Sequence, residues 1–312
     1  MMSSSNGQPN TWSPNLKFLK SGQITIDIGS LKENITWNFN NLKSFLPGIT
    51  NIECEINAFG VMAKGYGDGF SLHISLIKAF AEAFERAVML AKCPEASSSN
   101  GFSAERNQQL AIYSSRNELL ERSILLEAWK NKYAFSFHHH KSITVKFYEL
   151  FLKQRKIKLE YFKINSNAGE VLAVLAQHSN GQCLFDSTYL VPMKKQTQDA
   201  ERRLLLSVNR NLGVFDKCKL EAEWKLPEKG LPEDHRKFYL NPANKIAFDF
   251  LKKINSNENR LILPEVEKIK SEVIFEHPGL PVVANSHHTK WKKLEWGKCS
   301  IDGINPWPHP LA

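Results

Sequence analysis

Apolar and polar side chains alternate along residues 23–28 and, more regularly, along residues 51–58 (NIECEINA). A period of two residues is that of a strand with one buried face, so both segments predict strands. Other short apolar segments predict further strands at residues 142–150, 159–164, 171–176, 273–275 and 281–284. Residues 165–169 (NSNAG) supply a turn between two of them.

A helical period replaces this alternation elsewhere in the chain. It predicts helices at residues 70–92, 104–130, 196–211 and 244–254. The glycines of residues 60–69 (GVMAKGYGDG) predict a loop before the first helix, and residues 94–101 (PEASSSNG) predict another after it. Helices and strands come in blocks and no long polar linker divides them, so we expect an α+β fold in a single large domain.

The composition is that of a globular protein, with 42% hydrophobic and 23% charged residues. The longest apolar run, near residues 171–176, is too short to span a membrane, and we expect no membrane partner. Residues 1–20 begin with a polar Ser/Asn tract that has no signal-peptide core, and we expect them to be a disordered tail. Five scattered cysteines without a CxxC pattern favour a cytoplasmic protein.

Basic residues outnumber acidic ones by 41 to 32, giving a formal charge of +9. This excess admits a nucleic acid, an acidic peptide or a nucleotide as partner. The basic residues cluster mildly at Lys153, Arg155, Lys156 and Lys158, and again at Lys290, Lys292 and Lys293. Neither cluster has the interleaved aromatics of a single-strand binder, so charge alone leaves the class of protein open.

One pattern, ExxER, occurs on both long helices, with the residues Glu82, Glu85 and Arg86 on the first and Glu118, Glu121 and Arg122 on the second. Residues three and four apart share a helix face, so four carboxylates from two packed helices would form an oxygen-rich site suited to Mg²⁺. The arginines would hold phosphate oxygens. A solvated Glu/Arg face is the alternative. The preceding Lys64-Gly65 lacks the spacing of a P-loop, so a nucleotide site here is not a Walker site.

Three further features follow in order along the chain. Residues 99–101 (SNG) and Ser103 precede the second ExxER, Arg203 lies on the third helix, and Pro306, Pro308 and Pro310 form a PxPxP tail. Together with the Lys-Gly loop and the two ExxER helices, they make the sequence resemble the YcaO superfamily from about residue 55 onward.

The resemblance implies an α+β, YcaO-like mixed fold over residues 21–304, with the two ExxER helices packed on an antiparallel or mixed sheet, followed by a proline-rich tail at residues 305–312. It implies ATP and Mg²⁺ as cofactors. The implied nucleotide-binding residues are Lys64, Glu82, Glu85, Arg86, Ser103, Glu118, Glu121, Arg122 and Arg203. Of these, the metal shell would be Glu82, Glu85, Glu118 and Glu121, and the prolines Pro306, Pro308 and Pro310 would line the catalytic site.

The sequence departs from the superfamily pattern at several positions. A serine is replaced by Lys78, a glutamate and a glutamine by Leu110 and Ser114, and a second glutamate and glutamine by Ser207 and Arg210. The loss of two carboxylates would weaken a magnesium site by charge alone.

YcaO proteins use ATP to activate backbone amides of peptides. The resemblance therefore implies azoline formation (thiazoline or oxazoline) on Cys, Ser or Thr of a ribosomally made precursor peptide. Because no winged-helix leader-binding region is evident, we expect a separate leader-peptide-binding partner protein, and the resemblance admits a homodimer.

Three alternatives stay open. The substitutions at Leu110, Ser114 and Ser207 fit a catalytically degenerate subunit that acts as scaffold or activator of a partner enzyme. Other YcaO members make thioamides or amidines. A nucleic-acid-binding protein rests on net charge alone, and without a motif we expect no nucleic acid partner.

Overall fold

The computed structural model describes residues 21–28, 31–96, 98–133, 135–139, 142–190, 194–217, 232–252, 260–291 and 307–310. They form helices and antiparallel sheets, which confirms the α+β class. Two compact units make up the expected large domain, and each is described by itself. Unit 1 comprises Met1–Leu42, Thr50–Leu119 and Ile269–Thr289; unit 2 comprises Lys43–Ile49, Leu120–Lys268 and Lys290–Ala312. The expected tail at residues 1–20 lies outside the described residues.

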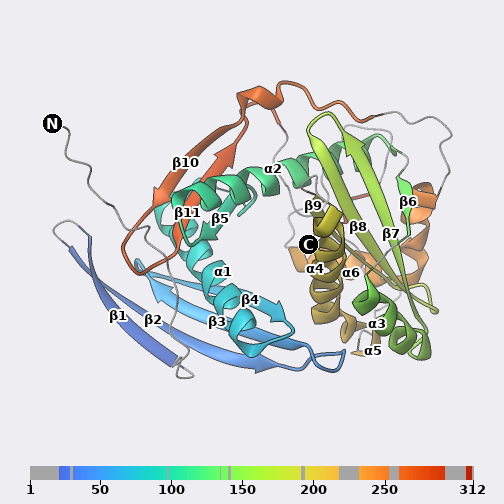
Figure 1. The fold of residues 1–312 in the computed structure, drawn as a ribbon, viewed down its shortest axis with the longest axis horizontal. Helices are drawn as coiled ribbons and strands as arrows, with labels where there is room; N and C mark the ends of the chain where they lie inside the picture. The colour runs from blue at the N-terminus through green and yellow to red at the C-terminus, as the bar shows by residue number, and fades with distance from the viewer. Residues whose placement is uncertain are drawn as a thin grey trace. The chain divides into compact units, whose positions relative to one another are not determined.

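Unit 1 contains two antiparallel sheets (Figure 1). The first has four strands in chain order, β1 (Ser21–Ile28), β2 (Leu31–Leu42), β3 (Thr50–Ala58) and β4 (Val61–Gly69). The second has the order β10-β11-β5, with β10 (Lys270–Phe275), β11 (Val282–His287) and β5 (Phe102–Glu105). Helix α1 (Leu72–Lys92) buries Ala79, Ala83 and Phe84 in a core shared with β3 and β11. Helix α2 (Gln108–Lys130) begins in this unit.

The predicted loop at residues 60–69 is wrong, because most of it is strand β4. Its glycines recur at every second position and face α1. A Cβ atom on Gly65 would lie 2.1 Å from the backbone nitrogen of Ala83, and one on Gly67 would lie 1.8 Å from the carbonyl oxygen of Ser75. Glycine therefore marks a close approach of strand and helix backbones here, not a flexible turn.

Unit 2 is built on one four-stranded antiparallel sheet in the order β6-β7-β8-β9 (Figure 1). These strands are β6 (Ser136–His138), β7 (Ile157–Ser166), β8 (Gly169–His178) and β9 (Cys183–Leu190). The α-helices are α3 (Ile143–Gln154), α4 (Lys194–Leu212), α5 (Val214–Lys217) and α6 (Pro232–Leu240). Two 3₁₀ segments follow, η1 (Pro242–Lys252) and η2 (Val266–Lys268).

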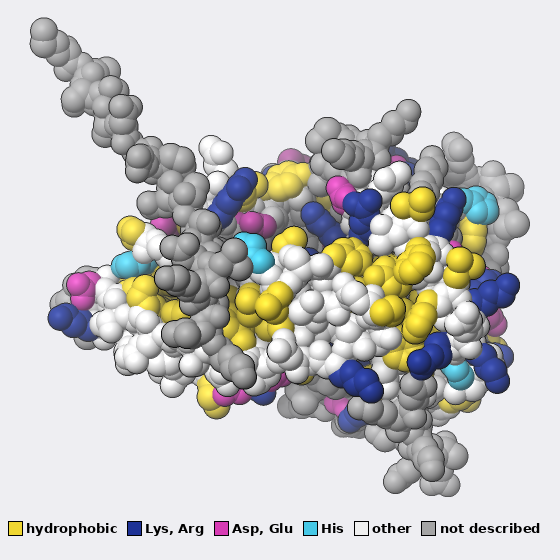
Figure 2. Space-filling view, turned by 60° about the horizontal axis from the view of Figure 1, so that its bottom comes forward, with side chains coloured by type: hydrophobic (Ala, Val, Ile, Leu, Met, Phe, Trp, Pro, Cys, Tyr) yellow, Lys and Arg dark blue, Asp and Glu magenta, His cyan; other side chains and the backbone are white. Residues whose placement is uncertain are grey.

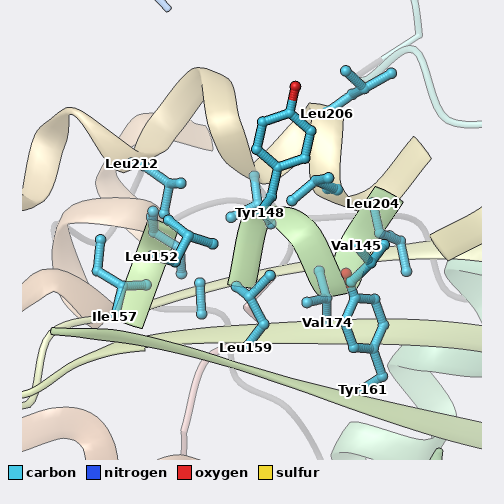
Figure 3. Packing of buried hydrophobic residues seen from close by; sticks show 14 of the residues in the cluster. Val145, Tyr148, Leu152, Ile157, Leu159, Tyr161, Val174, Leu204, Leu206 and Leu212 are labelled. Atoms are coloured by element: carbon cyan, nitrogen blue, oxygen red, sulfur yellow. The ribbon is translucent and has the colours of Figure 1, made fainter. Parts of the chain in front are cut away.

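A large core of unit 2 lies between the sheet and helices α3 and α4. Figure 3 shows Val145 and Leu152 of α3 packed with Leu159 and Val174 of the sheet and Leu204 of α4. A second core surrounds the fully buried indole of the last turn of α2. In the described part of the chain, no helix is long and apolar enough to cross a membrane.

Most predicted helices and strands are confirmed within a few residues, but one predicted strand is a helix in the structure. Residues 142–150, predicted as a strand, form most of α3. The strand prediction fails because this helix is apolar on both its buried and its outward face, which hides the helical period. The predicted helix at residues 244–254 is the 3₁₀ segment η1, and strands β2 and β9 were not predicted.

Candidate functional site

Strand β4 is at an edge of its sheet, so alternate backbone groups along it have no partner strand. Three side chains spaced four residues apart on α1 bind these groups instead. The contacts are Lys78 Nζ to the Asp68 carbonyl (3.0 Å), the Tyr66 N–H to Glu82 Oε2 (2.7 Å) and Arg86 Nη1 to the Lys64 carbonyl (2.8 Å). The spacing of the side chains along α1 matches the spacing of their partners along β4, because four helical residues rise about 6 Å and two strand residues rise about 6.8 Å.

Part of the predicted site is therefore already used in holding unit 1 together. The second oxygen of Glu82 forms an ion pair with Arg86, at 2.6 Å between Oε1 and Nη2. Lys64 lies in a strand, not a loop, and its ammonium group contacts Glu53 at 3.4 Å and Glu55 at 3.3 Å. The hydrogen bond to Glu55 and the charge of Glu53 both raise the pKa of Lys64.

Glu85, three residues after Glu82, is half-buried. Its Oε2 accepts a hydrogen bond from the backbone N–H of Ala104 in β5 at 3.1 Å. Burial raises the pKa of the Glu85 carboxyl well above its usual value, and the negative charge of Glu118 on α2 raises it further. Glu85 and Glu118, the predicted metal ligands of two different helices, are therefore within electrostatic reach of each other in unit 1.

Residues 99–101 lead into β5, and Ser103 lies in that strand. Gly101 has φ +81°, and a Cβ atom there would lie 2.2 Å from the carbonyl oxygen of Ser286 in β11. The Ser286 N–H also donates to the Gly101 carbonyl at 2.7 Å. Ser103 is opposite Ala284 in the same strand pair. The glycine of this motif is therefore required by backbone packing.

In unit 2, Glu121 is buried against the open edge of β9. Its two oxygens accept hydrogen bonds from the Ser187 hydroxyl at 2.8 Å and the Tyr189 N–H at 3.0 Å. Burial raises its pKa; the charge of Asp186 on β9 adds to the rise, and Arg122, 3.7 Å away, opposes it. The second glutamates of both ExxER patterns thus behave alike: each accepts a hydrogen bond from an edge-strand N–H, and the charge of another carboxylate raises the pKa of each.

Asp186 is a candidate residue that the sequence analysis missed. It accepts a hydrogen bond from the hydroxyl of Ser207 on α4, the position where a glutamate of the superfamily pattern is absent. Asp186 thus supplies a carboxylate beside the substituted position. Its signal in the sequence is weak, since it lies in the unpredicted strand β9 with no motif around it.

We call Glu85 with Glu118, and Glu121 with Asp186, the acidic pairs. Each pair is near an arginine of its own ExxER pattern, and each concentrates negative charge where burial already disfavours it. Magnesium commonly takes one or two protein carboxylates and completes its shell with water and phosphate oxygens, so this donor chemistry suits it. Among the described residues, no group of three or more His, Cys, Asp or Glu side chains forms a metal site.

Arg203 is exposed on α4 and makes no ion pair or hydrogen bond with another described residue. Its neighbour Arg202, in contrast, is paired with Asp199 at 3.3 Å. The role of Arg203 in phosphate binding stays a prediction.

The described part of the proline tail, residues 307–310, is docked in unit 2. Three consecutive carbonyls accept side-chain hydrogen bonds, that of Trp307 from Trp129 (3.0 Å), that of Pro308 from Tyr239, and that of His309 from the buried His235 (2.8 Å). Proline has no N–H, so a proline-rich segment is held through its carbonyls. Pro308 and Pro310 are fixed by this docking, whereas Pro306 lies outside the described residues.

No family model matches the sequence, and no curated protein matches it. The fold, however, is similar to solved structures. YcaO from Methanopyrus kandleri, bound with AMPPCP and Mg²⁺, matches at a TM-score of 0.51 and 12% identity over 79% of this chain and 85% of that one. The E. coli microcin synthetase McbBCD complex with bound pro-MccB17 matches at 0.54 and 10% identity, over 88% and 96% of the two chains. The chain therefore has a YcaO-like fold.

Proposed function

We propose that this protein uses ATP and Mg²⁺ to activate backbone amides, and that it forms azolines on Cys, Ser or Thr of a ribosomally made precursor peptide. One observation carries the proposal. In each unit the second glutamate of an ExxER pattern accepts a hydrogen bond from an edge-strand N–H and is within electrostatic reach of another carboxylate, and a divalent cation would neutralise this charge. The YcaO-like fold supports it, since one structure of that fold contains a nucleotide analogue and Mg²⁺.

The reaction must replace a carbonyl oxygen with the side-chain atom of the substrate. The Cys, Ser or Thr side chain attacks the preceding carbonyl carbon, the resulting oxyanion takes the terminal phosphoryl group of ATP, and phosphate leaves as the amide proton is lost. A C=N bond results, with ADP and phosphate as the other products. Phosphorylation replaces hydroxide, a poor leaving group, with phosphate, a good one. The protein therefore needs only to position the substrate and ATP and to stabilise the charge that develops on the transferred phosphoryl group.

The residues divide this work by chemistry. The acidic pairs would hold Mg²⁺, and Arg122 and Arg203 would hold phosphate oxygens. Ser103 and Lys64 stay in the proposed nucleotide site, although the Lys64 ammonium group is already held by two glutamates. The docked tail would line the site; its proline pattern favours azolines over thioamides or amidines.

A second candidate is a degenerate subunit that activates a partner enzyme. It is favoured by the contacts of Glu82 and Arg86, which are held on the edge of β4 and would leave only part of the predicted shell for metal and phosphate. For either candidate we propose a separate partner protein that recruits the precursor peptide.

Calorimetric titration with ATP, with and without Mg²⁺, tests the proposal. We expect magnesium-dependent binding that Glu118→Gln, Asp186→Asn and Arg203→Gln each weaken about tenfold or more, a loss of about 1.4 kcal/mol each. The matched control for Arg203→Gln is Arg202→Gln, one residue earlier on α4. The control for the carboxylates is Glu127→Gln, farther along α2.

Binding that these controls weaken equally, or that needs no magnesium, would contradict the proposed site. Absence of binding at millimolar ATP would reject the enzyme and leave the degenerate subunit.

A further inference from the structure

Helix α3 is apolar on two faces. Val145, Tyr148 and Leu152 are buried against the sheet of unit 2. On the outward face, Ile143, Phe147 and Leu150 are 79%, 64% and 68% exposed. Spaced four and three residues apart, these three form one line along the helix, which we call the α3 stripe. Among the described residues they are three of the five most exposed large hydrophobic side chains.

Positive charge lines this stripe. Lys146 lies three residues after Ile143 and four before Leu150, and Lys153 lies three residues after Leu150, so both exposed lysines follow one side of the stripe. The sole acidic residue in the sequence of α3, Glu149, is half-buried. On the face of the molecule that carries α3, Figure 2 shows gathered hydrophobic side chains with Lys and Arg around them.

Arg155 brings a further positive charge to the C-terminal end of the helix. Its guanidinium lies over the rings of Phe151 and Phe45, at 5.6 Å and 5.4 Å from their centroids. This stacking holds an otherwise mobile cation in place. Part of the basic cluster at Lys153, Arg155 and Lys156 is thus arranged around an apolar surface and is not merely a solvated run.

We propose that the α3 stripe binds an amphipathic helix of a separate partner protein, whose apolar face is flanked by acidic side chains. An exposed apolar line of this kind fits the face of another helix, with anchors at every third or fourth residue. The lysines select an acidic flank by charge complementarity. The inference rests on the proposed function only for the role of that partner, the recruitment of the precursor peptide.

A synthetic peptide of about 18 residues, or five helical turns, provides the probe, with leucines on one face and glutamates beside them. Fluorescence anisotropy of the labelled peptide against the full chain is expected to show saturable binding. Phe147→Ser should weaken it about tenfold or more. The matched control is Met62→Ser, because Met62 is 68% exposed in unit 1 and lies outside the stripe. The double variant Lys146→Glu with Lys153→Glu reverses two charges beside the stripe. It should bind a second peptide, in which lysines replace the glutamates, more tightly than the original peptide.

No saturable binding, or an equal loss in Met62→Ser, would overturn the inference. So would sedimentation that shows a dimer which Phe147→Ser dissociates, since a second copy would then occupy the stripe. Magnesium-dependent ATP binding is measured on the same variants. Intact ATP binding with no peptide binding rejects this inference alone, and the reverse result rejects the proposed function alone.

Discussion

The carboxylate of Glu82 accepts a hydrogen bond from the backbone N–H of Tyr66 at 2.7 Å, which closes the open edge of β4. Its other oxygen is held by Arg86 at 2.6 Å. A residue that a pattern assigns to metal binding thus replaces the neighbouring strand that β4 lacks. A substitution of Glu82 is therefore expected to lower the stability of the fold, whatever its effect on metal binding.

Glu82→Ala should lower the free energy of unfolding by about 1–3 kcal/mol, because it leaves the Tyr66 N–H and the Arg86 guanidinium without this carboxylate. Glu82→Gln keeps an acceptor oxygen and should cost less. Urea unfolding at constant m-value measures both. Equal losses in the two variants would show that the Tyr66 contact contributes nothing.

Gly67→Ala should destabilise unit 1 by about 3 kcal/mol or more, because the added methyl group would overlap the carbonyl oxygen of Ser75. Gly213→Ala is the matched control, since nothing lies within 4 Å of its Cβ position. We expect the control to stay within about 0.5 kcal/mol of the parent protein. Thermal unfolding compares the two, and a tolerated Gly67→Ala would contradict the close contact of α1 and β4.

Glu265 tests the electrostatics of unit 2. Lys268 at 2.7 Å and Lys290 at 2.9 Å lower its pKa from 4.5 to about 2. Because the folded pKa is the lower one, the stabilisation by this group is present above pH 4.5 and is lost as pH falls toward 2. NMR titration of the side chain should show this midpoint. Lys290→Gln and high salt should each raise it, and a midpoint that neither moves would refute the pairing.

Two cysteines should differ in reactivity. Cys54 is fully buried, and burial with the charges of Glu53 and Glu55 raises its pKa to about 12. Cys93 is only half-buried, and its pKa is raised as well. At pH 8 iodoacetamide should therefore modify Cys93 first and reach Cys54 only through unfolding. Mass spectrometry of digested peptides gives both rates, and comparable rates would contradict the burial of Cys54.

Ser207→Glu distinguishes the two candidate functions through Asp186. The new carboxylate would lie beside Asp186 and should lower stability by about 1 kcal/mol or more in EDTA. If the acidic pair of unit 2 binds Mg²⁺, the ion should restore more stability to this variant than to the parent protein. Thermal unfolding with and without Mg²⁺ measures the difference, with Ser207→Gln as the uncharged control. An equal response in all three proteins would count against a metal at this pair.

Part of the proposed site could be predicted from the sequence, and part could not. The ExxER repeat identifies Glu85 and Glu121 as candidate metal ligands, because helical spacing is a local property of the sequence. It gives the same prediction for Glu82, although Glu82 binds the edge of β4, a strand that the sequence analysis predicted as a loop. Asp186 could not be found at all, because it becomes relevant only when β9 and α4 bring it beside Ser207.

The sequence by itself determined the α+β class, the two long helices and the order of the motifs, because periodicity and local turns are read along the chain. The tertiary structure alone decided which carboxylates are buried, which are used at open strand edges, and that α3 is a helix with an apolar outer face. Burial and partner choice depend on residues far apart in the chain, so no local pattern contains them.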